Sequence, residues 1–137
     1  LVILSHVLEH LTDLNNVLKK INLITNKYLF IEVPGHIKKL QSIQNAHNFY
    51  FSINTLKYFV LNNKFNLIKI DYCKENEFIF ALFEKSNKNH VYNYDYQEEK
   101  LIINKIYNHY LLKYPILKMI KFTKSENLIE KFRKIIK

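Results

Sequence analysis

The sequence contains a single glycine, Gly35, among its 137 residues. A loop that brings its backbone close to a phosphate or a ribose usually needs several glycines, because glycine alone adopts positive φ without strain. This stretch of chain therefore excludes a glycine-rich cofactor loop of its own. The only cysteine, Cys73, rules out an internal disulfide and suits a cytoplasmic protein. The absence of any run of eighteen apolar residues predicts no transmembrane segment.

Arginine is also scarce, with Arg133 the only one, although the formal net charge is +9. From Lys100 onward the chain has ten basic residues and only two acidic ones, Glu126 and Glu130. The positive charge is therefore concentrated near the end of the chain. Proteins that recognise nucleic acids usually use arginine, whose planar fork pairs with phosphate and guanine. The lysine-rich tail is therefore interpreted mainly as a codon bias. Weak contact with an anionic membrane surface remains a possible role for it.

Four short apolar segments have the composition of β-strands. They are Leu1–Leu4, Tyr28–Val33, Phe65–Tyr72 and Phe78–Glu84. The first is a continuous aliphatic run, which predicts a strand buried on both faces. The last two are separated by the short polar turn Lys74–Asn76, which predicts that they are antiparallel neighbours.

Two segments between these strands have helical spacing of apolar residues. Thr12 or Asp13 can cap the first helix, and Ser52 can cap the second. Their apolar faces comprise Leu14, Val17, Leu18, Ile21 and Ile24 in the first, and Ile53, Leu56, Phe59 and Val60 in the second. The second helix is expected to stop at Asn62–Asn63, because asparagine tolerates the left-handed conformation. The alternation of strands and helices predicts an α/β fold.

The composition changes after Lys85, which predicts three parts: an α/β domain over residues 1–85, a linker over 86–95 and a basic helical extension over 96–137. In the extension, the segment Tyr96–Tyr114 is expected to be helical until Pro115. Ser125 can cap a final amphipathic helix. The alternating Tyr92, Tyr94 and Tyr96 are expected to pack against an edge of the fold.

The opening segment, a strand that runs into Val7-Leu8-Glu9-His10 and then an amphipathic helix, resembles class I S-adenosylmethionine-dependent methyltransferases of the small-molecule type. Further segments are similar to that family and occur in its order: Tyr28–Pro34 as a strand ending in proline, the aromatic segment His47–Ser52, and the closing pair of strands. The resemblance covers residues 1–85. It implies the second half of a Rossmann-like sheet whose final strand is antiparallel.

The family's glycine-rich loop and the acidic residue that holds the cofactor ribose would precede Leu1. Because the sequence begins inside an apolar strand without methionine, we expect more chain before it. Two glycines common in the family are replaced here, one by Asn26 or Lys27 and one by Lys64. Asparagine adopts positive φ with little strain, so we expect these turns to survive.

The resemblance implies S-adenosylmethionine as the cofactor, with Ser5, His6 and Val7 lining it after the first strand. It also implies that His47 and Tyr50 lie over the acceptor pocket, with His10 as a third candidate catalytic residue or as a residue that orients its loop. A base is needed only where the acceptor loses a proton, and histidine titrates near neutral pH. Glu32 could face the pocket or a helix, and packing against a helix is favoured.

The expected function is methyl transfer to a small-molecule acceptor such as a sugar or a quinone. Other readings remain open: a non-enzymatic basic binding module, or an inactive methyltransferase relic. A zinc metallohydrolase is a further alternative, because His6-Val7-Leu8-Glu9-His10 matches the H-x-x-E-H pattern. That pattern needs both histidines on one helical face and a third ligand elsewhere, so no metal is predicted.

Overall fold

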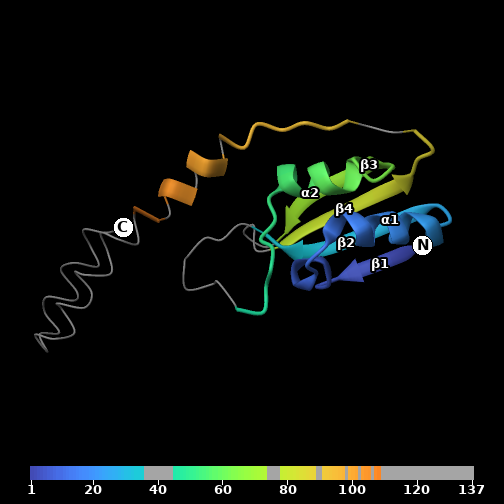
Figure 1. The fold of residues 1–137 in the computed structure, drawn as a ribbon, viewed down its shortest axis with the longest axis horizontal. Coiled ribbons are helices and arrows are strands. Elements are labelled where there is room, and N and C mark those ends of the chain that lie inside the picture. The colour runs from blue at the N-terminus through green and yellow to red at the C-terminus, as the bar shows by residue number, and fades with distance from the viewer. Residues whose placement is uncertain are drawn as a thin grey trace, which may run out of the picture. The chain divides into compact units, whose positions relative to one another are not determined.

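The computed structural model describes residues 1–35, 45–73, 78–88 and 91–108, without 98, 102 and 106. The chain divides into two compact units. The first runs from Leu1 to Asp95 apart from residues 39–41, and it contains all the labelled strands and helices (Figure 1). The second holds residues 39–41 and the chain from Tyr96.

The first unit is built on a mixed four-stranded sheet. Its strands are β1 (Val2–Ser5), β2 (Tyr28–Pro34), β3 (Phe65–Cys73) and β4 (Phe78–Lys85), in the spatial order β1-β2-β4-β3. β1 and β2 are parallel, whereas β4 lies between β2 and β3 and is antiparallel to both. The α/β class and the antiparallel closing pair are thereby confirmed.

Two α-helices and one short 3-10 helix accompany the sheet. They are η1 (Leu8–His10), α1 (Leu14–Ile24) and α2 (Ile53–Leu61). Asp13 caps α1 by accepting a hydrogen bond from the Asn16 amide at 3.1 Å. Ser52 caps α2 through a reciprocal pair of bonds with Thr55. Both caps match those expected from the sequence, since a side-chain oxygen satisfies amides left free in a first helical turn.

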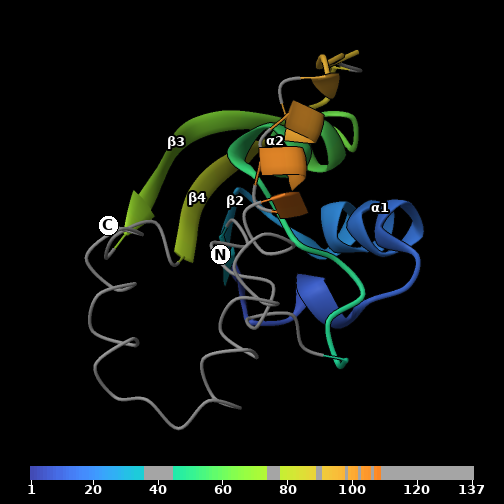
Figure 2. The ribbon, with the colours of Figure 1, turned by 90° about the vertical axis from the view of Figure 1, so that its left-hand side faces the viewer.

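The hydrophobic core lies between the two α-helices and one face of the sheet. Figure 2 shows α1 and α2 on the same side of the sheet. Alternate residues of the strands point to that side, because side chains in a strand alternate between faces. The buried core residues of the helices are Leu14, Leu18, Ile21, Leu56 and Val60, and those of the central strands are Leu29, Ile31, Val33, Ile79, Ala81 and Phe83. Ile24, which was expected to share the face of α1, is 70% exposed at the end of that helix.

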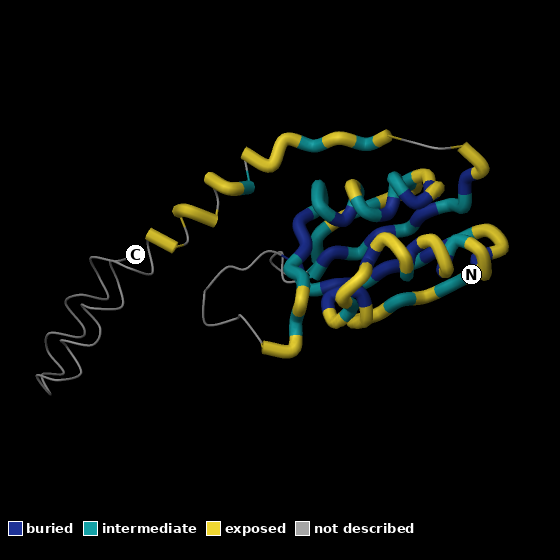
Figure 3. Tube along the Cα trace, in the orientation of Figure 1, coloured by how far each residue is buried: buried dark blue, intermediate teal, exposed yellow. Residues whose placement is uncertain are grey.

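The prediction that the first strand is buried on both faces is wrong for the described part of the chain. β1 is an edge strand, and its Ile3 is 59% exposed. Figure 3 shows exposed and half-buried residues along the first strand, near the N-terminus. Ile3 is in register with Phe30 of β2, whose ring stacks on that of Phe80 at 6.1 Å between centroids. These side chains occupy the face of the sheet opposite the helices. An aliphatic run is consistent with a strand buried on two faces. Whether the second face is buried depends on which other parts of the fold pack against it.

Two non-glycine residues of the described chain adopt positive φ: His6 at 53° and Lys64 at 63°. The left-handed residue after α2 is therefore Lys64, whereas Asn62 is right-handed with φ −71°. The two asparagines instead stabilise the end of the helix through hydrogen bonds of their side chains. Asn63 donates to the Phe59 carbonyl at 2.8 Å, and Asn62 exchanges hydrogen bonds with the backbone of Tyr92. The expectation that asparagine would relieve this turn through its own φ is thus wrong.

The chain after β4 follows α2 before it enters the second unit. The ring of Tyr94 lies 5.5 Å from that of Tyr58 on α2, whereas Tyr96 is 56% exposed. The prediction that the alternating tyrosines pack is therefore confirmed for Tyr94, on a helix and not on an edge, and is wrong for Tyr96. In the second unit, the described residues between Gln97 and Asn108 are helical. The turn at Lys74–Asn76 and the final helix expected after Ser125 lie outside the described residues. Within the part of the chain that is described, no helix is long and apolar enough to cross a membrane.

Candidate functional site

A polar cluster lies where β1 and β2 end. β1 ends at Ser5, and the next residue, His6, donates its backbone N–H to the Glu32 carbonyl of β2 at 2.9 Å. The left-handed conformation of His6 then redirects the chain into η1. In open α/β sheets, ligands bind beyond the carboxyl ends of the strands. The sharp turn after β1 therefore places polar side chains where such folds bind ligands.

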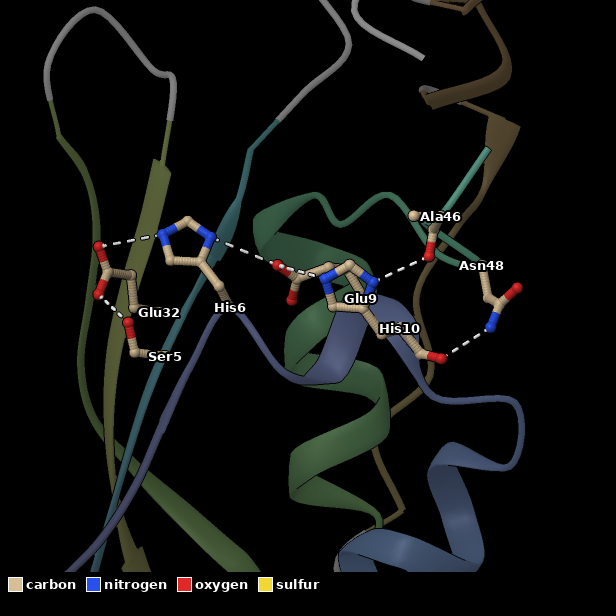
Figure 4. Close-up of polar contacts among 7 residues, drawn as sticks. All are labelled: Ser5, His6, Glu9, His10, Glu32, Ala46 and Asn48. Atoms are coloured by element: carbon tan, nitrogen blue, oxygen red, sulfur yellow. Dashed lines mark hydrogen bonds and ion pairs between the residues drawn. The ribbon is translucent and has the colours of Figure 1, made fainter. Parts of the chain in front are cut away.

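Glu32 belongs to this cluster. Its carboxylate accepts a hydrogen bond from Ser5 Oγ at 2.7 Å and lies 3.7 Å from His6 Nε2 (Figure 4). The preference for packing of Glu32 against a helix is therefore wrong for the described part of the chain. In β2 it alternates with the buried Ile31 and Val33, so it occupies the face of the sheet opposite the core.

Glu9 is a buried acidic residue at the centre of the cluster. It is 1% exposed, and neither carboxylate oxygen has a hydrogen-bond partner in the described part of the chain. The nearest cationic candidate is His6, whose Nδ1 lies 3.3 Å from Glu9 Oε1, although without the geometry of a hydrogen bond. An isolated buried carboxylate is strongly unfavourable, because burial removes the water that stabilises its charge. Among the described residues, the imidazoles of His6 and His10 lie near enough to compensate this charge, at 3.3 and 3.9 Å from Oε1.

His10 is oriented by the segment that precedes α2. Its Nδ1 lies 2.8 Å from the Ala46 carbonyl, and its own carbonyl accepts a hydrogen bond from the Asn48 side chain at 2.8 Å (Figure 4). A carbonyl can only accept a hydrogen bond, so Nδ1 carries the proton. Nε2 of His10 lies 3.9 Å from Glu9 Oε1. In the neutral imidazole, Nε2 therefore presents a lone pair near a carboxylate oxygen.

His47 lies next to His10 in the same polar cluster. Its ring lies edge to face with that of His10 at 4.8 Å between centroids and 5.5 Å from the ring of Tyr50. Nδ1 of His47 is buried and has no hydrogen-bond partner among the described residues. The backbone amides of Asn48 and Phe49 donate to the Glu9 carbonyl at 2.7 and 3.1 Å. These bonds hold the His47 segment against η1.

The six predicted site residues form two neighbouring groups. Ser5, at the end of β1, and His6 and Val7 of the following turn are exposed. His10, His47 and Tyr50 are brought together by the contacts between η1 and residues 46–50. Their assigned roles remain predictions.

Glu9 was not selected from the sequence except as one letter of the H-x-x-E-H pattern. Because glutamate is rarely fully buried, only its place between two histidines could have marked it. The structure also lacks the helix that this pattern requires, since His6 is left-handed and η1 has only three residues. The two histidines of the pattern therefore do not share a helical face.

Comparisons with protein-family models, with curated proteins and with solved structures gave no match for this chain.

Proposed function

We propose that this chain is part of a class I S-adenosylmethionine-dependent methyltransferase that acts on a small-molecule acceptor. The observation that carries the proposal is the position of β4, which lies antiparallel between β2 and β3 at one end of the sheet. The sequence resembles the closing half of that family, in which the last strand is inserted antiparallel. Segments chosen for their similarity to this half therefore lie in an arrangement compatible with it.

The free edge and the open face of the sheet also support the proposal. β1 is an edge strand in the described chain, and its exposed Ile3 shares with Phe30 and Phe80 the face that no described helix covers. Further strands beside β1 and helices on this face would bury these side chains. A glycine-rich loop carried by that additional part of the sheet would face the turn after β1.

Within this proposal, Ser5, His6 and Val7 line the cofactor. All three are exposed at the carboxyl end of β1. The left-handed φ of His6 turns the backbone away from the strand direction at this point. The acceptor would lie towards His47 and Tyr50, whose segment is bonded to η1 next to this turn.

Methyl transfer is a direct displacement at the methyl carbon of a sulfonium ion. Alignment of the acceptor atom with that carbon provides much of the catalysis. A hydroxyl acceptor must also lose a proton, and an imidazole is suited to accept it near neutral pH. His47 and His10 would provide that base, with Tyr50 orienting the acceptor. A sugar or a quinone is the class of acceptor proposed.

The test begins with the reading frame that precedes the Leu1 codon. The proposal expects it to encode an apolar strand, a glycine-rich loop and an acidic residue roughly twenty positions further on. The protein encoded by the whole frame should then bind S-adenosylmethionine with one-to-one stoichiometry in calorimetry. An unrelated upstream sequence, or a whole protein that fails to bind the cofactor, would contradict the proposal. Either result would leave an inactive relic or a basic binding module.

A further inference from the structure

We infer that Glu9, His10 and His47 form a binding site for a divalent transition-metal ion. The three side chains each offer one ligand atom, and these atoms lie within 4.8 Å of one another. The ligand set is one carboxylate oxygen and two imidazole nitrogens. This inference rests only on the contacts between η1 and residues 46–49. Where the ion is bound, His10 and His47 act as its ligands and not as the base proposed above for methyl transfer.

The first argument is the burial of the Glu9 carboxylate without a hydrogen-bond partner in the described chain. Its side chain is 99% buried, and both oxygens lack a hydrogen-bond donor among the described residues. Removing a carboxylate from water costs several kcal/mol even after relaxation, by the usual order-of-magnitude estimate. A metal ion bound between the carboxylate and the imidazoles offsets this cost with a double positive charge.

The second argument is the orientation of His10. Its Nδ1 donates to the Ala46 carbonyl at 2.8 Å, which leaves Nε2 unprotonated in the neutral ring. That nitrogen lies 3.9 Å from Glu9 Oε1, so in the neutral ring its lone pair lies near a carboxylate oxygen. Histidines that bind metals commonly donate their second N–H to a backbone carbonyl in this way, which fixes the tautomer and the ring.

The third argument is the unbonded nitrogen of His47. Nδ1 of this ring is buried and has no hydrogen-bond partner in the described chain, and the ring lies against that of His10. The segment is fixed by the amides of Asn48 and Phe49, both of which donate to the Glu9 carbonyl. The loop therefore brings a nitrogen ligand to the group from a separate part of the chain.

The distances suit a four-coordinate ion after a small adjustment. Ligand atoms about 2.1 Å from a tetrahedral zinc ion lie roughly 3.4 Å apart. The observed limit of 4.8 Å thus requires side-chain movements of roughly an ångström on binding. Mixed imidazole and carboxylate ligands favour zinc, cobalt, manganese or iron over calcium and magnesium, which prefer oxygen. Three protein ligands leave a position open for water or an acceptor oxygen.

The test is a titration of the 137-residue chain, first freed of metal with a chelator, with Co²⁺ and Zn²⁺. We expect one equivalent of Co²⁺ to produce visible absorption bands and Zn²⁺ to displace it. In NMR spectra, Zn²⁺ should shift the imidazole signals of His10 and His47. Binding at a different stoichiometry, or without these shifts, would contradict the assignment.

Three variants separate this site from its neighbours. Glu9→Gln preserves the shape of the side chain, and His47→Ala removes the ligand from the second segment. Each should weaken Zn²⁺ binding by at least about a hundredfold, because even groups that only support a ligand contribute tenfold to hundredfold. The control is His6→Ala, which removes a histidine at 3.3 Å from Glu9 that does not belong to the group.

The control should bind Zn²⁺ within a few-fold of the unsubstituted chain. Equal binding by all four proteins would overturn the inference. A loss in His6→Ala as large as that in His47→Ala would instead place the ion between the turn and Glu9, and would also overturn it. Circular dichroism on each metal-free variant checks that its fold is intact, and Glu9→Gln serves as the decisive variant if His47→Ala unfolds.

Discussion

Asn22 of α1 donates its side-chain amide to the carbonyl of Lys64 at 2.9 Å. The same carbonyl accepts the backbone N–H of Ser86 at 2.9 Å, so the left-handed turn before β3 is tied to both a helix and the end of β4. A lysine in this conformation is strained because its Cβ crowds the backbone. The surrounding hydrogen bonds maintain the conformation despite the strain.

We predict that Lys64→Gly stabilises the protein by about 1 kcal/mol, because glycine adopts positive φ without a Cβ clash. Lys64→Ala is the matched control, since it removes the long side chain and keeps the Cβ. Alanine should leave the free energy of unfolding close to that of the unsubstituted protein. Urea denaturation measures the free energy of unfolding of all three proteins. Equal stability of the Lys64→Gly and Lys64→Ala variants would contradict the strain argument.

Leu18 and Leu23 offer a comparison within α1. Leu18 is fully buried in the core, whereas Leu23 is 79% exposed. Leu18→Ala should cost about 2–5 kcal/mol, because it removes buried methyl groups and leaves a cavity. Leu23→Ala should change stability by less than about 0.5 kcal/mol. Thermal unfolding distinguishes the two variants, and similar losses would show that the assigned helix face is incorrect.

The contribution of the Ser52 cap of α2 to stability can also be tested. Ser52 accepts the Thr55 amide at 3.0 Å, and its own amide donates to Thr55 Oγ1 at 2.7 Å. Ser52→Ala should therefore cost about 1 kcal/mol. Thr12→Ala, at an exposed position next to the Asp13 cap, should cost less than about 0.5 kcal/mol. Denaturant midpoints measure both, and an unchanged midpoint for Ser52→Ala would contradict the contribution of the capping box.

Much of the fold was predictable because it depends on local patterns. Asp13 and Ser52 precede apolar residues at helical spacing, and the strands were found to within one or two residues. The exposed Ile3 was not predictable, since a run of aliphatic residues contains no information on what covers its second face. Lys64 was marked only as the replacement of a family glycine, and the left-handed conformation was assigned to the two neighbouring asparagines instead.

The candidate site was likewise predictable only in part. His10, His47 and Tyr50 were selected by resemblance, and the described contacts bring them together. The burial of Glu9 could not be deduced, because a glutamate in a short turn is normally exposed. Glu9 is instead held against a distant segment, in which the amides of Asn48 and Phe49 donate to its carbonyl.

In the metal-free protein, we predict that Glu9→Gln is at least as stable as the unsubstituted chain. The change removes a buried charge without a hydrogen-bond donor and introduces an amide that can donate to His10 Nε2. The gain is expected to be about 1–3 kcal/mol, similar to the cost of an unsatisfied buried polar group. The measurement is thermal unfolding in a chelator. A destabilisation of that size would show that imidazolium groups already compensate the carboxylate. Glu84→Gln on β4 is the control at a partly buried position and should have little effect.

The hydrogen bonds from Asn48 and Phe49 to the Glu9 carbonyl have a consequence for local opening. When residues 46–49 separate from η1, these two amides become available to exchange with deuterium, and His47 leaves Glu9. Exchange at both amides therefore reports how often the cluster comes apart. An ion that binds only the closed arrangement would slow this exchange in proportion to its occupancy, while amides in the middle of β4 would be unaffected.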